Sequence, residues 1–455
     1  MQTKPQQQSA EKVLRVLVFT LMITVMSATM FNIVLPQIRT EFHLSFSQVS
    51  WVTSAFLLIY AVGTVMYGKL ADSYKLKHLL TFGLILFAIG SVIGFFAHNY
   101  GMVLCGRIVQ AAGAAVVPAT SSIIPVRYFP PESRGRALGI SMTGMAIGNA
   151  LGPVLSSLLV SLLDWRWLFC MPLFTLFAVP FFRKYLEEEE REAVKMDWIG
   201  GGLLAITIAL LLLAITNQSL LLALGCILSF LLFLVRIRTT AEPFIRPGLF
   251  RSKRYSLGLV IAFLMIGSGY SFAFLSPQLL ADVNHLAPGL IGFVMVPGAI
   301  VTAFLGKKAG ILADKKGNSY LFYTASALLL SSFVLFSSFA GVSPLLIAVF
   351  LIFGNVGLSF MMISMSNAIS QSLPKEQIGV GMGLLAMLNF IAGALAATLY
   401  GKSIDGGAAE SWNLLNSYPG ASVYSNIYSA LVLVILGLAV LYYRQFGRSS
   451  VRGIN

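Results

Sequence analysis

The sequence predicts an all-α membrane protein with fourteen transmembrane helices, and its composition and hydropathy pattern support this. Of the 455 residues, 57% are hydrophobic and 11% are charged, whereas a water-soluble domain usually carries about 25% charged residues. Apolar runs long enough for a bilayer-spanning helix of about 20 residues recur along the whole chain. These runs lack the alternating polarity and the length of about 10 residues that strands of a membrane β-barrel show.

Fourteen apolar runs meet the length that a transmembrane helix requires. They begin near Val13, Ser50, Leu79, Tyr100, Ala137, Trp167, Trp198, Ser219, Ser256, Pro288, Ser319, Pro344, Ile378 and Tyr424. The first run has no small-residue cleavage site after it, so we expect a retained span rather than a removable signal peptide. Because the number of spans is even, both termini lie on the same side of the membrane.

The distribution of Lys and Arg orients the chain in the membrane. With the N-terminus in the cytoplasm, 27 of the 31 basic residues fall in cytoplasmic segments. Arg39, Arg166 and Lys402 fall outside, and Arg107 lies within a span. Such an excess marks cytoplasmic loops, so we expect both termini in the cytoplasm. The same placement explains the net charge of +14, and we expect a lipid bilayer rather than nucleic acid as the partner of the basic residues.

A polar octapeptide occurs twice on the predicted cytoplasmic side, as GKLADSYK from Gly68 and as GILADKKG from Gly310, 242 residues later. Two six-span halves of about 185 residues would separate the copies by about 185 residues, and the surplus of about 57 accommodates two extra helices. We therefore expect a six-helix bundle in 1–185, two additional linker helices with a cytoplasmic connector in 186–240, and a second six-helix bundle in 241–455. Internal duplication of this kind is typical of secondary transporters that rock two halves around a central site.

At these residues the chain resembles the major facilitator superfamily, and within it the fourteen-span drug:proton antiporter branch. GKLADSYKLK is similar to the loop signature after the second span, although Ser73 and Lys75 replace a basic residue and a glycine. RIVQAAGAA from Arg107 is similar to the fourth-span signature, and GNALGPVLSS from Gly148 to the antiporter signature of the fifth span. GMGLLAMLNFIAG and EPFIRPGL are most similar, within that branch, to bacterial tetracycline-efflux proteins of the K and L classes.

The resemblance implies a conformational latch in the cytoplasmic loops. Its carboxylates would pair with basic residues of the next cytoplasmic loop or face a helix N-terminus, and breaking these contacts would permit rocking. The alternative is an ordinary solvated charge at a helix end. The latch residues are Gly68, Asp72, Gly310, Asp314, Arg134 and Arg136.

Small residues mark the fifth span, where Gly144, Gly148 and Gly152 recur every four residues and Pro153 follows. Small side chains at that spacing let a second helix approach closely, and a proline loosens the local hydrogen-bond ladder. We interpret this antiporter motif as a bending, close-packed helix that controls leakage and exchange. Generic packing of small residues is compatible with the same pattern.

Polar side chains within the spans are candidates for a substrate cavity. They need partners in a membrane and often line cavities, although interhelical hydrogen bonding is the alternative for each of them. Met361, Met362 and Met365 add adaptable surface suited to flat or varied ligands. The candidate cavity residues are Asn32, Tyr60, Asn149, Tyr270, Asn355 and Asn389.

Arg107 is a charge within a span, roughly 10 Å from the outer face at 1.5 Å per residue. Its guanidinium either snorkels to the outer interface or, as the resemblance implies, faces the central cavity and helps proton exchange. All 17 acidic residues fall in loops, tails or helix ends. We therefore expect Arg107 to hydrogen-bond to Gln110 or to backbone carbonyls, or to pair with an anionic group of the substrate. Proton coupling by the usual intramembrane carboxylate is in doubt for the same reason.

These observations predict a monomeric transporter in the cytoplasmic membrane that exports small amphipathic compounds, tetracycline-like drugs among them, by alternating access and in exchange for protons. The alternatives are an uncoupled or differently coupled carrier of a metabolite, lipid or anion, and a transporter-like sensor without turnover. We do not expect an enzyme, because no His lies at depth in a span. We also expect no cofactor and no metal site, because Cys105, Cys170 and Cys226 lack metal-ligand spacing.

Single cysteines at positions 195 and 402 test the predicted topology. The positive-inside count places Lys195 in the cytoplasm and Lys402 outside. In a background without the native cysteines, a membrane-impermeant thiol reagent added to intact cells should label Lys402→Cys and spare Lys195→Cys. Labelling of both variants from the same side would contradict the count of fourteen spans.

Overall fold

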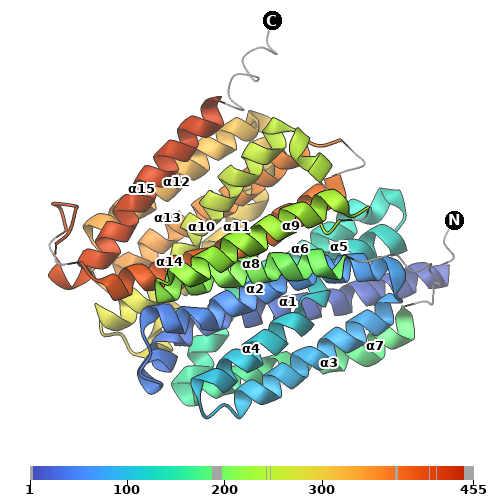
Figure 1. The fold of residues 1–455 in the computed structure, drawn as a ribbon, viewed down its shortest axis with the longest axis horizontal. Coiled ribbons are helices and arrows are strands. Elements are labelled where there is room, and N and C mark those ends of the chain that lie inside the picture. The colour runs from blue at the N-terminus through green and yellow to red at the C-terminus, as the bar shows by residue number, and fades with distance from the viewer. Residues whose placement is uncertain are drawn as a thin grey trace, which may run out of the picture. The chain divides into compact units, whose positions relative to one another are not determined.

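The computed structural model describes residues 4–186, 197–241, 243–245, 247–374, 378–408, 410–416 and 418–444 (Figure 1). All regular elements in these residues are helices. Fourteen of the described segments are long and apolar enough to cross a membrane, and each begins within four residues of its expected start. The all-α class and the number of spans are thereby confirmed.

The chain divides into two compact units, of which unit 1 is Met1–Phe31 with Trp51–Arg246 and unit 2 is Asn32–Ser50 with Pro247–Asn455. The helices that contribute to unit 1 are α1 (Lys4–Glu41), α2 (Phe46–Ser73), α3 (Leu76–Phe95), α4 (Tyr100–Ala114), α5 (Val116–Tyr128), α6 (Pro131–Leu162), η1 (Trp165–Phe177), α7 (Ala178–Tyr185), α8 (Trp198–Asn217) and α9 (Leu220–Thr239). The end of α1 and the start of α2 belong to unit 2.

Unit 2 is completed by the helices that follow Arg246. These are η2 (Pro247–Arg251), α10 (Lys253–Asp282), α11 (Pro288–Lys316), α12 (Asn318–Ser338), α13 (Pro344–Ser370), α14 (Ile378–Gly406), η4 (Pro419–Ala421) and α15 (Ser422–Tyr442). Within this unit α12 lies against both α13 and α15 (Figure 1). The rings of Phe322 on α12 and Tyr442 on α15 stack with their centroids 3.6 Å apart.

Polar residues at the ends of apolar runs determine where several helices begin. Asn99 accepts a hydrogen bond from the Met102 amide at 2.9 Å and so caps α4. Ser219 and Ser252 cap α9 and α10 in the same way, which satisfies amides that a helix leaves unpaired in its first turn. The sixth span begins as a 3-10 helix at Trp165 and continues as α7.

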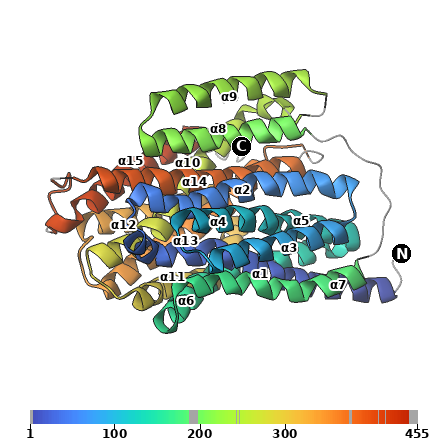
Figure 2. The ribbon, with the colours of Figure 1, turned by 60° about the horizontal axis from the view of Figure 1, so that its bottom comes forward.

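The two additional helices, α8 and α9, form an antiparallel hairpin (Figure 2). Gln218 adopts a left-handed conformation with φ of 51°, which ends α8 and lets α9 begin two residues later. The hydroxyls of Thr207 and Ser229 lie 2.9 Å apart and join the helices. The outer surface of α9 is rich in exposed apolar side chains such as Leu221 and Leu224, as expected for a helix in contact with lipid.

The glycines of the antiporter motif bring α6 against α1. A Cβ atom at Gly144 would lie 2.8 Å from the Val18 carbonyl oxygen, and one at Gly148 would lie 2.5 Å from the Met22 carbonyl oxygen. A Cβ at Gly152 would collide with the Thr29 hydroxyl. The predicted close approach of a second helix is therefore confirmed, and that helix is α1.

Replacement of Gly148 by Ala should lower the thermal stability of the purified protein. The added methyl group must push α6 from the α1 backbone, and such overpacking costs about 1–3 kcal/mol. The matched control is Gly437→Ala on α15, where a Cβ atom would meet nothing within 4 Å. That substitution should raise stability slightly, because Ala favours a helix over Gly. Equal melting temperatures for the two variants would contradict the packing described.

Candidate transport site

Arg107 lies on α4 and is completely buried. Its Nε donates to the Val52 carbonyl of α2 at 3.2 Å, and its Nη1 donates to the Ser27 carbonyl of α1 at 3.2 Å. Nη1 also donates to Oε1 of Gln110 at 3.1 Å. Two of the three kinds of partner predicted for Arg107 are thus present. The side chain has no exposed surface, so the alternative of a snorkelling guanidinium does not describe it.

Two aromatic rings complete the environment of the guanidinium. Its central carbon lies 4.2 Å from the Phe31 ring centroid and 4.0 Å from that of Phe56. Cation–π contacts in a site without water contribute about 2 kcal/mol. Tyr60 lies one turn after Phe56 on α2, and the centroids of their stacked rings are 5.5 Å apart. This predicted cavity residue therefore packs behind the ring that contacts the guanidinium.

Gln110 is held in one orientation by α3. Its Nε2 donates to the Ser91 hydroxyl at 2.8 Å, and that hydroxyl donates to the Phe87 carbonyl at 2.9 Å. The amide oxygen of Gln110 consequently faces Arg107. This chain of contacts requires α3 and α4 to lie very close, which Gly90 permits because a Cβ atom there would collide with the Gln110 backbone.

A second polar site lies within unit 2, where α10, α13 and α14 line a small pocket with about 10 Å³ of free space. The side-chain amide oxygen of Asn389, Oδ1, is buried in this pocket and has no hydrogen-bond partner among the described residues. The pocket is lined by Ala262, Met265, Ile266, Met361, Met362, Met365, Ser366, Leu385 and Asn389. The three methionines of the predicted adaptable surface therefore meet a fourth, Met265, which the sequence analysis missed.

The other predicted cavity residues do not line this pocket. In unit 2, the Asn32 amide donates to the Tyr270 hydroxyl at 3.5 Å, and the Asn355 amide donates to the Leu351 carbonyl of its own helix at 2.8 Å. Asn149 is exposed on α6 in unit 1. Hydrogen bonding along or between helices, the alternative weighed for these amides, describes Asn355 well.

The sequence analysis placed the acidic residues at the ends of spans but missed what two of them bind. In unit 2, Oδ1 of Asp282 accepts from Arg39 at 2.7 Å, and the Tyr424 hydroxyl lies 3.3 Å from Oδ2 of the same carboxylate. The carboxylate of Asp405 accepts the amides of Phe46 and Ser47 at 2.7 and 2.8 Å. These contacts tie the end of α1 and the start of α2 to α10, α14 and α15. The sequence hinted at these contacts only through Arg39, which is one of the three basic residues predicted on the outer side of the membrane.

The predicted latch is described only in part, because the side chains of Asp72, Arg134 and Asp314, together with Gly310, lie outside the described residues. Arg136 donates to Glu11 of α1 at 2.7 Å, with 64% of the Arg136 side chain exposed. A Cβ atom at Gly68 would meet nothing within 4 Å. The latch remains a prediction.

The described residues hold no group of three or more His, Cys, Asp and Glu side chains that could bind a metal ion. The candidate sites of both units are therefore built from amides, hydroxyls, thioethers, aromatic rings and one buried guanidinium.

Comparison with known families identifies the chain. The model of the Major Facilitator Superfamily matches residues 17–397. The chain belongs to the Major Facilitator Superfamily. It is therefore a multi-pass membrane protein and a secondary transporter.

Several curated members of this superfamily are similar to the chain. The riboflavin transporter RibZ of Clostridioides difficile strain 630 is 27% identical over 398 residues, which are 85% of this chain and 87% of that protein. Multidrug resistance protein 3 of Bacillus subtilis strain 168 is 25% identical over 78% of this chain and 72% of that protein. The multidrug efflux pump SdrM of Staphylococcus aureus strain N315 is 22% identical over 95% of this chain and 96% of its own.

Solved structures of transporters share the fold at low sequence identity. A POT family transporter in complex with 5-aminolevulinic acid has a TM-score of 0.71 and 13% identity, over 95% of this chain and 96% of that one. A bacterial homolog of the human lysosomal transporter Spinster has a TM-score of 0.67 and 14% identity, over 98% of this chain and 99% of that one. These likenesses establish the superfamily fold.

Arg107→Lys should slow substrate exchange by about tenfold or more. Lysine keeps the charge but cannot reach two carbonyls and an amide with a planar fork, and each charge-assisted hydrogen bond contributes about 1.5–3 kcal/mol. The matched control is Arg166→Lys, because Arg166 is partly exposed and its pair with Asp164 resembles surface pairs worth about 0–1 kcal/mol. If Arg107→Lys exchanged substrate at the wild-type rate in reconstituted vesicles, Arg107 would not be part of the transport site.

Proposed function

We propose that this secondary transporter belongs to the fourteen-span drug:proton antiporter branch and exports small, flat, amphipathic compounds across the cell membrane by alternating access. The methionine-lined pocket of unit 2 is the observation that carries the proposal. Thioether side chains are flexible and polarisable, and proteins use them where a surface must adapt to ligands of different shape. Tetracycline-like drugs are among the compounds of this kind.

The buried side-chain oxygen Oδ1 of Asn389 places an unpaired hydrogen-bond acceptor in this otherwise apolar pocket. A buried acceptor without a partner costs about 1–3 kcal/mol, and a ligand N–H or O–H group would recover that free energy. Ligand pockets usually measure about 300–1,000 Å³. The free space between these side chains is about 10 Å³, so a ligand would bind only after the flexible methionine side chains and their helices move apart, as alternating access allows. The proposed ligand therefore carries a hydrogen-bond donor on a flat ring.

The curated relatives support two versions of this function. Multidrug resistance protein 3 and SdrM are named for drug resistance and drug efflux, which favours export of varied compounds. The name of RibZ points to riboflavin, a flat heteroaromatic compound with a ring N–H, so a carrier of such a metabolite is the second candidate. Both versions use the same pocket chemistry.

Protons are the proposed exchanged ion, although the spans carry their acids at helix ends. Arg107 cannot release a proton near neutral pH, so it would act by holding α1, α2 and α4 in place while another group titrates. A proton carrier must titrate near the working pH. Proton movement is therefore the part of the proposal that needs direct measurement.

Counterflow into proteoliposomes with the purified protein tests this function. Riboflavin, tetracycline and ethidium serve as probes, and a disaccharide serves as the hydrophilic control. We expect exchange of at least one flat probe. In a separate assay of net uphill transport into the vesicles, a trapped pH dye should report alkalinisation of the lumen, because protons leave as the compound enters. Net transport without proton movement would show a differently coupled carrier, and binding without exchange would show a sensor.

Asn389→Ala should weaken binding of the transported probe by about tenfold, which corresponds to the loss of one hydrogen bond to a buried group. The matched control is Asn217→Ala, because the Asn217 amide is exposed at the end of α8 and donates to its own helix. Equal affinities for the two variants would exclude the unit 2 pocket as the binding site.

A further inference from the structure

We propose that Asp197 and Lys69 are positioning residues that fasten the start of the connector between α9 and α10 to unit 1. The α8–α9 hairpin and residues Pro243 and Phe244 would then travel with unit 1, and the chain would bend beyond Phe244 when the units move. This inference rests on the proposed alternating access, because an anchor affects transport only if the two units move relative to each other.

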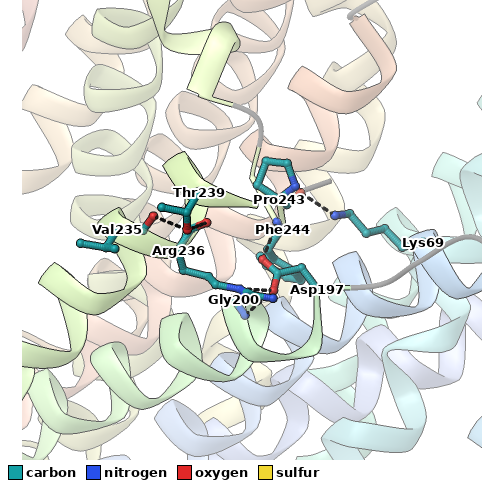
Figure 3. A network of polar contacts seen from close by, with 8 residues as sticks. All are labelled: Lys69, Asp197, Gly200, Val235, Arg236, Thr239, Pro243 and Phe244. Carbon is teal, nitrogen blue, oxygen red and sulfur yellow. Dashed lines mark hydrogen bonds and ion pairs between the residues drawn. The ribbon is translucent and has the colours of Figure 1, made fainter. Parts of the chain in front are cut away.

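Asp197 joins three segments through one carboxylate (Figure 3). Oδ1 accepts from the Gly200 amide at 3.0 Å and from Nε of Arg236 at 2.9 Å. Oδ2 accepts from the Phe244 amide at 3.2 Å. The side chain of Asp197 has no exposed surface. It therefore caps the start of α8, pairs with the last turn of α9 and holds the connector at the same time.

Lys69 holds the same connector from α2. Its Nζ donates to the Pro243 carbonyl at 2.8 Å (Figure 3) and lies 5.4 Å from the Phe244 ring centroid. The Phe244 side chain is buried against the start of α8, where a Cβ atom at Gly201 would lie 3.0 Å from the ring. The phenyl ring thus fits a space that a glycine leaves open.

The charge of Asp197 persists over the physiological pH range. Burial opposes ionisation, but the amides of Gly200 and Phe244 and the guanidinium of Arg236 outweigh it and hold the pKa of Asp197 below its ordinary value. A lowered pKa means that the anchor is complete above an ordinary aspartate pKa of about 3.9 and weakens only as the pH falls below it. At neutral pH the carboxylate is therefore charged and can accept all three hydrogen bonds.

The repeated octapeptide supports a role for Lys69 that is specific to the first copy. GKLAD and GILAD align Lys69 with Ile311, which is an exposed apolar residue on α11 in unit 2. The chain has one connector after α9, and one copy carries the lysine that binds it. Unit 1 ends at Arg246 and unit 2 resumes at Pro247, so the anchored residues Pro243 and Phe244 belong to unit 1.

Hydrogen–deuterium exchange of the reconstituted full-length protein tests the anchor directly. The Phe244 amide donates to Asp197, so its exchange reports whether the connector is held. We expect about tenfold faster exchange at Phe244 in Asp197→Asn and Arg236→Gln, a change of about 1.4 kcal/mol in local opening. Arg236→Lys should restore part of the protection. The matched control is Arg238→Gln, an exposed arginine of the same helical turn, and equal exchange in all four variants would overturn the proposal.

A cross-link tests whether the anchor stays closed during transport. The variant Lys69→Cys, Pro243→Cys is made in a background without the native cysteines. A bifunctional thiol reagent about 10 Å long, roughly the length of three extended residues, then joins the two cysteines. We expect substrate exchange to match that of the same variant treated with a monofunctional reagent. Loss of exchange on cross-linking alone would show that the connector must leave unit 1. If the native protein exchanges no probe, the proposed function fails while the amide measurement still decides whether the anchor exists.

Discussion

A guanidinium in the centre of a helix bundle has to be satisfied by the bundle itself, and the arrangement of unit 1 follows from that requirement. Arg107 lies on α4, yet its hydrogen-bond partners Val52, Ser27 and Gln110 come from α2, α1 and its own helix. An uncompensated buried charge would cost several kcal/mol. Three helices must therefore keep their mutual positions for these hydrogen bonds to persist, and a shift of any of them would change the contacts of the guanidinium.

Small residues make such close positions possible. Gly90 and Gly106 let α3 and α4 touch through their backbones, while Gly144 and Gly148 do the same for α6 and α1. Without side chains between them, the helices gain dispersion contacts that lipid cannot supply as well. The packing of α6 against α1 and the hydrogen bond from Arg107 to the Ser27 carbonyl thus both constrain α1.

The sequence predicts what depends on local composition and misses what depends on tertiary contacts. Span positions, the number of helices and the need of Arg107 for neutral partners all follow from hydropathy and from the cost of burying charge. Spacing could also have revealed Phe56 and Tyr60, which lie one turn apart on α2. The pairing of Arg39 with Asp282 could not be predicted, because the two residues lie 243 positions apart and each reads alone as an ordinary charge at a helix end.

The two copies of the repeated octapeptide, one in each unit, differ at the position that the proposed fastening uses. Both copies share glycine, leucine, alanine and aspartate at the same positions. The copies differ outside these positions: Lys69 of the first copy donates to the Pro243 carbonyl of the connector, whereas Ile311 of the second copy is an exposed apolar residue. Because the connector directly follows α8 and α9, the role proposed for the lysine belongs only to the copy that precedes these two helices. The fastening is thus a consequence of the fourteen-helix architecture rather than of the duplicated fold, and it distinguishes the two copies on physical grounds.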